Sequence, residues 1–154
     1  MPRLLAGLIL SAALTLLSAP ALFAADAPVF VGSKACSQCH EEQYATFNKY
    51  SKKAHSWRSI AVMQPKLKPN ELKECFECHT TGYGKPGGFV SEQATPDLAQ
   101  VGCETCHGPG SAHAESGDPK LIRRKPELAT CQACHNSQRI EDFGFKPLVY
   151  SGAH

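Results

Sequence analysis

The first pattern along the chain is an apolar run at its amino terminus. Arg3 supplies a positive charge, a largely apolar stretch follows over 4–17, and small residues cluster over 19–25. This is the layout of a secretory signal peptide. A membrane-spanning helix needs roughly 20 apolar residues, and Pro20 interrupts the run before it reaches that length. The pattern therefore predicts a cleaved leader over residues 1–25.

Cleavage of this leader would leave residues 26–154, about 129 residues, which is enough for one compact domain. Retention of the leader as an anchor is the alternative. Because no second long apolar run follows, either outcome places 26–154 outside the cytoplasm, in a periplasmic or extracellular location. After cleavage we expect no integral membrane span.

Helical spacing of apolar positions is strongest just after the first cysteine pair. The longest predicted helix runs from Glu41 towards Met63, with a break near Ser51 as the alternative to one continuous helix. Its apolar positions are Tyr44, Phe47, Trp57 and Ile60, and its solvent-facing positions are Lys49, Lys52, Lys53 and Arg58.

Later in the chain, sequences typical of helix starts occur at 70–71, 95–97 and 126–127. Stretches rich in glycine and proline separate these segments, at 81–88 and 108–110. We therefore expect a mainly α, loop-rich fold with little sheet.

The cysteines fall in a repeated pattern. The chain has eight, grouped in four pairs, and a histidine follows each pair at once. The pairs are Cys36 and Cys39, Cys75 and Cys78, Cys103 and Cys106, and Cys131 and Cys134, and the histidines that follow them are His40, His79, His107 and His135. Four such C-x-x-C-H motifs predict the covalent attachment of four haem c groups.

The spacing of the motif has a chemical reason. On one helical turn its two cysteines and its histidine share a face, so two thiols can form thioethers with the porphyrin edge while the histidine binds the iron. A disulfide scaffold, the usual use of eight cysteines in an exported protein, gives no reason for the adjacent histidines. A zinc site is also disfavoured, because zinc sites built from cysteine pairs do not require a neighbouring histidine.

Size and charge follow from this cofactor content. About 129 residues over four haems leave about 32 residues for each, so we expect a haem-packed core in which the porphyrins supply much of the buried apolar surface. The chain has 16 basic and 14 acidic side chains, and roughly eight propionate charges would make the holoprotein acidic. Nothing indicates nucleic-acid binding. The basic stretch over 49–73 either pairs with propionates, docks an acidic redox partner or is a solvated surface.

The second axial ligand of each iron separates electron carriers from ligand-binding catalysts. Beyond the motif histidines the chain has His55, His113 and His154, so three distal histidines are available for four haems. A Gly-Pro-Gly turn between His107 and His113 would aim His113 away from the haem on His107. A continuous helix through His55 would carry it to a haem other than the one on His40.

Each distal assignment has an alternative. His55 is either a ligand or a solvent-exposed side chain, and His154 is either a ligand or part of a frayed terminus. Met63 is a further candidate for the fourth iron, but a methionine in an amphipathic stretch is more often a packing residue than a ligand, and that is our interpretation of it.

The stretches around the second and third motifs carry a more specific signal. Residues 75–84 read CFECHTTGYG, and residues 102–113 read GCETCHGPGSAH. Together with the opening VGSKAC over 31–36 and the KAH segment over 53–55, they resemble the tetrahaem cytochrome c-554 family over essentially the whole mature chain. The resemblance implies three haems with two histidine ligands each and one high-spin haem with an open position.

Transferred by position, the resemblance pairs each distal histidine with a motif histidine. The implied pairs are His113 with His40, His55 with His107, and His154 with His135. The haem on His79 would then keep the open position.

These features predict extracytoplasmic electron transfer. Paired histidine ligands give low potentials, and haems crowded onto a short chain are close enough to exchange electrons. The partners would be other redox proteins, either cytochromes or quinol-linked enzymes. Two alternatives remain: reduction of a small ligand such as a nitrogen oxide at the open haem on His79, or a role as a subunit of a larger conduit, complex or filament to which His154 contributes a ligand.

Overall fold

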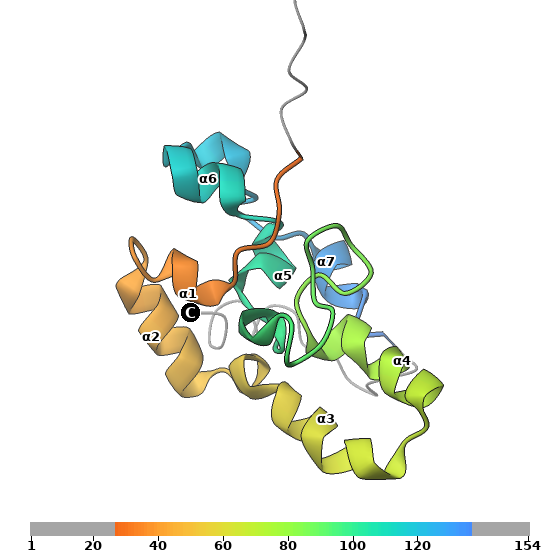
Figure 1. Cartoon of the computed structure of the whole chain (residues 1–154). Helices are drawn as coiled ribbons and strands as arrows, with labels where there is room; N and C mark the ends of the chain where they lie inside the picture. Colours follow the sequence, from red (N-terminus) through yellow and green to blue (C-terminus); the bar gives the residue numbers. More distant parts are fainter. Residues whose placement is uncertain (1–26, 137–154) are drawn as a thin grey trace, which may run out of the picture.

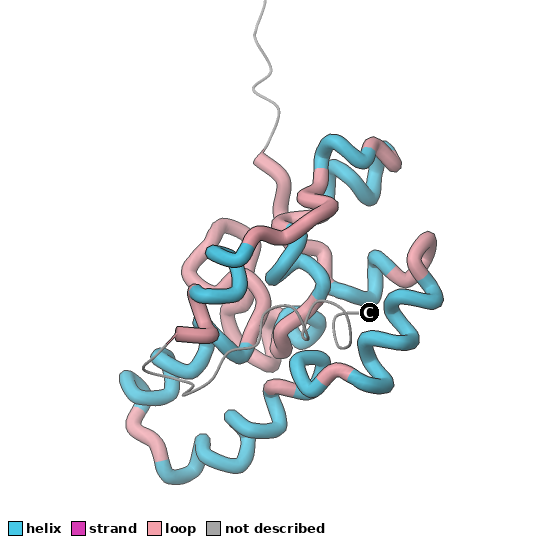
Figure 2. Tube along the Cα trace, turned by 180° about the vertical axis from the view of Figure 1, so that it is seen from behind, coloured by secondary structure: helices cyan, strands magenta, loops and turns pink. Residues whose placement is uncertain are grey.

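The computed structural model describes residues 27–136. The predicted signal peptide over 1–25 and the predicted ligand His154 lie outside the described residues. Within them the chain forms short helices joined by long loops, without a strand (Figures 1 and 2). The prediction of a mainly α, loop-rich fold is confirmed. Across 27–136 no helix has the length and hydrophobicity that crossing a membrane would require.

The described part of the chain contains α-helices and single-turn 3-10 helices, labelled α and η. In order they are α1 (Ser33–Cys36), α2 (Glu41–Tyr50), η1 (Lys52–His55), α3 (Trp57–Met63), η2 (Gln64–Lys66), α4 (Pro69–His79), η3 (Pro96–Leu98), α5 (Cys103–His107), α6 (Ser111–Ser116), η4 (Pro119–Leu121) and α7 (Leu128–Gln132). In Figure 1, α2, α3 and α4 follow one another along the outer edge of the molecule. Inside that edge, α1 contacts both α5 and η3.

The long helix predicted from Glu41 towards Met63 is not continuous. Ser51 is extended, with φ −87° and ψ 121°, and its hydroxyl accepts a hydrogen bond from the Lys53 N–H at 3.3 Å, which starts η1. The alternative of a break near Ser51 is therefore confirmed. The helix-length argument for the reach of His55 does not hold, because α2 ends before that residue.

The predicted helix starts before the second and fourth motifs are confirmed. α4 begins at Pro69, and the Glu71 carboxylate accepts a hydrogen bond at 2.8 Å from the backbone N–H just before the helix. α7 begins directly after Glu127.

Before the third motif the predicted helix start is wrong. The sequence at 95–97 begins a separate turn, η3, and α5 starts only at Cys103. Between η3 and α5, backbone N–H groups donate to side-chain hydroxyls instead of to the carbonyls of a helix. The hydroxyl of Thr81 accepts from the N–H of residue 102 at 2.9 Å, and that of Ser56 accepts from the Val101 N–H at 2.9 Å.

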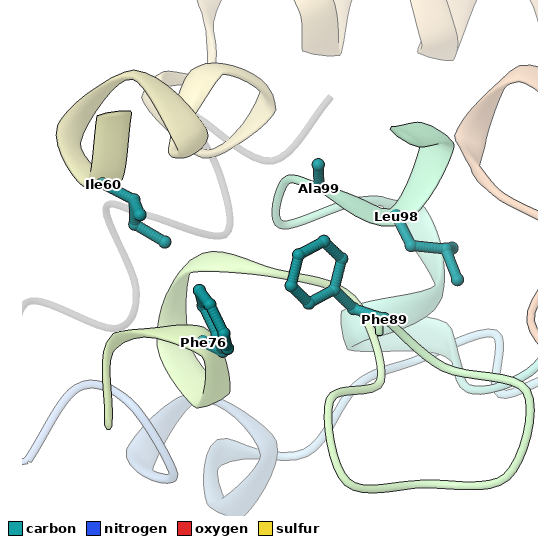
Figure 3. Packing of buried hydrophobic residues seen from close by; sticks show 5 residues of the cluster. All are labelled: Ile60, Phe76, Phe89, Leu98 and Ala99. Carbon is teal, nitrogen blue, oxygen red and sulfur yellow. The ribbon is translucent and has the colours of Figure 1, made fainter. Parts of the chain in front are cut away.

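The apolar core is small and lies against the second motif. Its buried members are Ile60, Phe76, Phe89, Leu98 and Ala99 (Figure 3). Phe76 stands between the two cysteines of the motif, and its ring meets that of Phe89 edge to face, with centroids 5.1 Å apart. Trp57 packs against both rings, with centroids 5.5 Å from Phe89 and 6.1 Å from Phe76.

The loop that follows α4 places Phe89 in this core. The Phe89 N–H donates to the carbonyl of Thr81, and the Thr81 N–H donates to the carbonyl of Leu98, both at 2.9 Å. Only glycine fits at position 88, because a Cβ there would collide with the carbonyl of Gly82.

Candidate haem sites

Each C-x-x-C-H motif forms a single helical turn, as its spacing predicts. The second and third motifs lie in α4 and α5, which end on His79 and His107. In the first and fourth motifs the histidine N–H bonds to the carbonyl of the first cysteine, at 2.9 Å for His40 and 2.8 Å for His135. The two cysteines and the histidine of each motif therefore lie on one face, as thioether attachment and iron ligation require.

Thiols of different motifs lie side by side. All eight cysteines fall within the described residues and are free thiols. A hydrogen bond between Cys36 and Cys103 raises the pKa of Cys36 and lowers the pKa of Cys103 to about 6. Burial, together with a hydrogen bond to Cys78, raises the pKa of Cys134 to about 12. The first motif thus meets the third, and the second meets the fourth.

The third and fourth motifs are also neighbours. Burial raises the pKa of Cys106, and the nearby thiol of Cys131 raises it further. Burial lowers the pKa of His135, and the positive charge of Lys53 acts in the same direction. The positive charge of Lys53 also acts to lower the pKa of Cys106, so a basic side chain lies near both motifs, and one interpretation of the basic stretch would pair it with a haem propionate.

His40 and His113 face each other across a gap. Their ring planes are nearly parallel, inclined by 23°, and the ring centroids are 6.2 Å apart. Two imidazoles that bind opposite sides of one iron through nitrogens at about 2 Å have centroids about 6 Å apart. The spacing fits an iron held between these two rings, and α6 carries His113 to this position from the chain just after the third motif.

Hydrogen bonds at Nδ1 orient three of the histidines. The Nδ1 atoms of His79, His107 and His113 lie 3.2, 2.6 and 2.9 Å from the carbonyl oxygens of Ser56, Arg123 and Asp118 respectively. An imidazole that donates from Nδ1 presents Nε2 to a metal, and most metal-bound histidines are held in this way. These rings fit ligation through Nε2.

His55 is held by its other nitrogen. Its Nε2 lies 2.8 Å from the carbonyl oxygen of Asn48, so ligation through Nδ1 would keep this bond and ligation through Nε2 would break it. Its pairing with the haem on His107 stays a prediction. Met63, interpreted from the sequence as a packing residue, is instead exposed, because it is the last residue of α3 and lies beyond the core.

Glu104, a variable position of the third motif, is a residue that the sequence analysis missed. Its side chain is 2% exposed, and its carboxylate accepts hydrogen bonds from the N–H groups of Val31, Gly32 and Gly110 at 2.7 to 3.1 Å. Two of these donors directly precede α1, and the third directly precedes the helix of His113. One carboxylate therefore clamps the first motif, the third motif and a distal ligand together.

The sequence contains only a weak indication that Glu104 is buried and binds these backbone groups. A glutamate between two motif cysteines gives no sign of burial, since such positions carry no chemical requirement of their own. Glycines at 32 and 110, where a backbone N–H can approach an acceptor closely, were the one hint.

Two further observations suit a bound haem. A cavity of about 440 Å³ opens where three motifs converge, lined by Cys134, Glu77, Thr105 and the basic Arg123, among others; a basic side chain there suits a propionate. Near the second motif, the buried Nε1–H of Trp57 has no acceptor within the described part of the chain. A propionate would supply one.

The chain matches known proteins over most of its length. Residues 35–108 match the family model described as cytochrome c554 and c-prime, and residues 96–140 match a model for a doubled C-x-x-C-H motif. The chain is 39% identical to cytochrome c-554 of Nitrosomonas europaea, over 84% of this chain and 66% of that protein, so it spans just under two thirds of that relative's length. The solved structure of reduced cytochrome c554 from the same species matches with a TM-score of 0.57 and 25% identity, over 81% of this chain and 84% of that one.

Proposed function

Because the chain belongs to the cytochrome c554 family and carries covalently bound haem c, we propose that it transfers electrons outside the cytoplasm through four haems. Haem c supplies an iron that exchanges single electrons between its ferrous and ferric states. The residues of this chain attach the haems, ligate the irons and hold the four sites next to one another.

Hydrogen bonds between the segments that carry different motifs are the observation that carries the proposal. The Cys103 N–H donates to the hydroxyl of Ser33, on the helix of the first motif, at 3.0 Å, and the thiol of Cys134 donates to the carbonyl of Glu77 in the second motif at 3.8 Å. Arg123 joins the third and fourth motifs, because its guanidinium donates to the carbonyl of Cys106 at 3.3 Å and to the hydroxyl of Thr130 at 3.2 Å. Each thiol marks the edge of the haem that it holds, so the four sites form an unbroken series in the order first, third, fourth and second. Such a series gives an electron a route through the whole domain.

The ligands are assigned as follows. The thioether bonds are formed by Cys36, Cys39, Cys75, Cys78, Cys103, Cys106, Cys131 and Cys134. The proximal ligands are His40, His79, His107 and His135. His113 completes the iron on His40, which the 6.2 Å spacing of the two rings supports. The pairings of His55 with His107 and of His154 with His135 rest on the family resemblance. The iron on His79 then keeps an open position, and reduction of a small ligand there is the alternative activity.

Carbon monoxide binding to the dithionite-reduced holoprotein tests this assignment. The wild type should bind one carbon monoxide per four haems, at the iron on His79. His113→Ala should bind two, because loss of the distal imidazole opens the iron on His40. Glu115→Gln, on the same helix and exposed, is the control and should bind one.

Two results would contradict the assignment. Four low-spin haems that do not bind carbon monoxide would show that no iron has an open position, and the protein would then be a carrier with four six-coordinate haems. An unchanged stoichiometry in His113→Ala would show that His113 does not ligate the iron on His40.

Export and partners complete the proposal. We propose that residues 1–25 direct the chain out of the cytoplasm, that 26–154 form the tetrahaem domain, and that it exchanges electrons with other cytochromes or with quinol-linked enzymes. Haem-stained protein should be recovered from the periplasmic or extracellular fraction of expressing cells. Recovery of apoprotein from the cytoplasm alone would contradict this location.

A further inference from the structure

We propose that Ser56 is a positioning residue that fixes the imidazole of His79 and thereby sets the reduction potential of the iron bound to it. The inference rests on the proposed function, because it takes His79 as the proximal ligand of a covalently attached haem. It concerns a residue outside the haem motifs for which no role was predicted from the sequence.

Ser56 and His79 are joined by two reciprocal hydrogen bonds. The Nδ1–H of His79 donates to the carbonyl oxygen of Ser56 at 3.2 Å, and the hydroxyl of Ser56 donates to the carbonyl oxygen of His79 at 2.8 Å. These bonds join His79, the last residue of α4, to Ser56, which lies between η1 and α3. The helix α3 itself contacts α4 (Figure 1). The ring and the backbone of His79 are therefore held by the same partner.

Ser56 is itself fixed in place. Its side chain is 9% exposed, its hydroxyl also accepts from the N–H of Val101 at 2.9 Å, and its own N–H donates to the carbonyl of Lys53 at 3.1 Å. The next residue, Trp57, packs on Phe76 in the core, with ring centroids 6.1 Å apart. Because these contacts hold Ser56, its carbonyl oxygen has a fixed position, and the imidazole of His79 can donate to it in only one orientation.

An acceptor at Nδ1 changes what the imidazole does to an iron. It selects the tautomer whose Nε2 is unprotonated and faces the metal. It also draws the Nδ1 proton away from the ring, which makes Nε2 a stronger donor. A stronger donor favours ferric iron and lowers the reduction potential. The effect matters most where the histidine is the sole protein ligand, as proposed for the iron on His79.

Ser56→Ala in the holoprotein is the principal test. It removes the hydroxyl that holds Ser56 to His79 and Val101, so the carbonyl loses its fixed position. The iron–histidine stretching band of the reduced, five-coordinate haem, measured by resonance Raman spectroscopy, should move to lower frequency, and the potential of that haem should rise. The potentials of the other three haems should not change. Ser56→Thr, which keeps a hydroxyl, should restore both values.

Ser51→Ala is the matched control. Ser51 is buried on the same segment and its hydroxyl also accepts a backbone hydrogen bond, but that bond comes from the N–H of Lys53. The same loss of a buried hydroxyl should therefore leave the band and the potential of the haem on His79 unchanged. A shift as large as that of Ser56→Ala would mean that general loosening of the segment, rather than contact with His79, is responsible.

A measurement on the wild type covers the case in which Ser56→Ala does not retain its haems. The Nδ1 proton of His79, observed by NMR, should exchange slowly in deuterated water, because its acceptor is buried. Rapid exchange would overturn the proposal, as would an unchanged band and potential in a fully loaded Ser56→Ala. A second carbon monoxide site in Ser56→Ala would point to loss of the neighbouring ligand His55, and would also overturn it.

Failure of the proposed open position on the iron of His79 gives a different result. If the wild type binds no carbon monoxide, the open position is wrong, and the slow exchange of the His79 proton still tests the role of Ser56. If the wild type binds carbon monoxide while this proton exchanges rapidly, the open position stands and the role of Ser56 is wrong.

Discussion

Two regions of the molecule hold their histidines by opposite means. Around the first and third motifs, the carboxylate of Glu104 collects backbone N–H groups from segments far apart in the chain. Around the second motif, an aromatic core that includes Phe76 and Phe89 packs against the helix itself, and Ser56 binds His79 beside that core. One region is organised by directed polar bonds and the other by apolar packing.

The contrast follows from what each region packs against. His40 and His113 are proposed to approach one haem from both sides. The porphyrin then supplies the apolar surface, and the chain must orient the two histidines. Hydrogen bonds to a buried carboxylate provide this orientation. Where one side of the haem is open, as proposed for His79, the proximal side needs a rigid wall of its own. Close-packed aromatic rings provide it.

The largest effect should come from Phe76→Ala. Phe76 is the centre of the aromatic core, and loss of such a side chain costs about 3–5 kcal/mol in the free energy of unfolding. Guanidinium unfolding followed by circular dichroism measures this cost. The resonance Raman band of the haem on His79 should broaden, while the low-spin signals should keep their shape.

Tyr50→Ala, which removes an exposed aromatic ring, is the control and should change stability by less than about 0.5 kcal/mol. Equal losses in the two variants, or a Phe76→Ala effect on the haem of His40 rather than on that of His79, would contradict the division into two regions.

A smaller effect is expected for Glu104→Gln. The amide nitrogen cannot accept a hydrogen bond, so at least one of the N–H groups now bonded to the carboxylate loses its acceptor, at a cost of about 2–3 kcal/mol. Because the clamp holds the first motif to the helix of His113, the EPR signal of the low-spin haem on His40 should broaden.

Glu115→Gln, an exposed change on the helix of His113, serves as the control and should leave this signal unchanged. If Glu104→Gln instead perturbed the carbon monoxide complex at the iron on His79 and spared the low-spin signal, Glu104 would not be the clamp of the first and third motifs.

The smallest effect should come from Ser33→Ala. The buried hydroxyl of Ser33 accepts a hydrogen bond from the Cys103 N–H at 3.0 Å, a second link between the first and third motifs. Its loss should cost about 1 kcal/mol, again measured by guanidinium unfolding. Ser59→Ala, at an exposed position, should cost less, and a Ser33→Ala cost above that of Glu104→Gln would reverse the proposed order of the two links.

Short-range sequence patterns were enough to predict the local parts of this protein. The spacing of each C-x-x-C-H motif is enough to predict a helical turn with two thiols and an imidazole on one face, because that geometry depends only on residues within one turn. The starts of α4 and α7 were predictable for the same reason, since Glu71 and Glu127 act on the residues next to them. Haem content and helical class followed from these local patterns.

The contacts between the motifs, in contrast, depend on the tertiary structure. The ring of His113 lies near that of His40, Glu104 binds Gly32, and Ser56 binds His79, all across long stretches of chain. The predicted helix start before the third motif failed because hydroxyls from distant segments compete for that backbone. A short-range pattern carries no information about which buried donor will face which acceptor, because that choice is made when separate segments pack around the same interior.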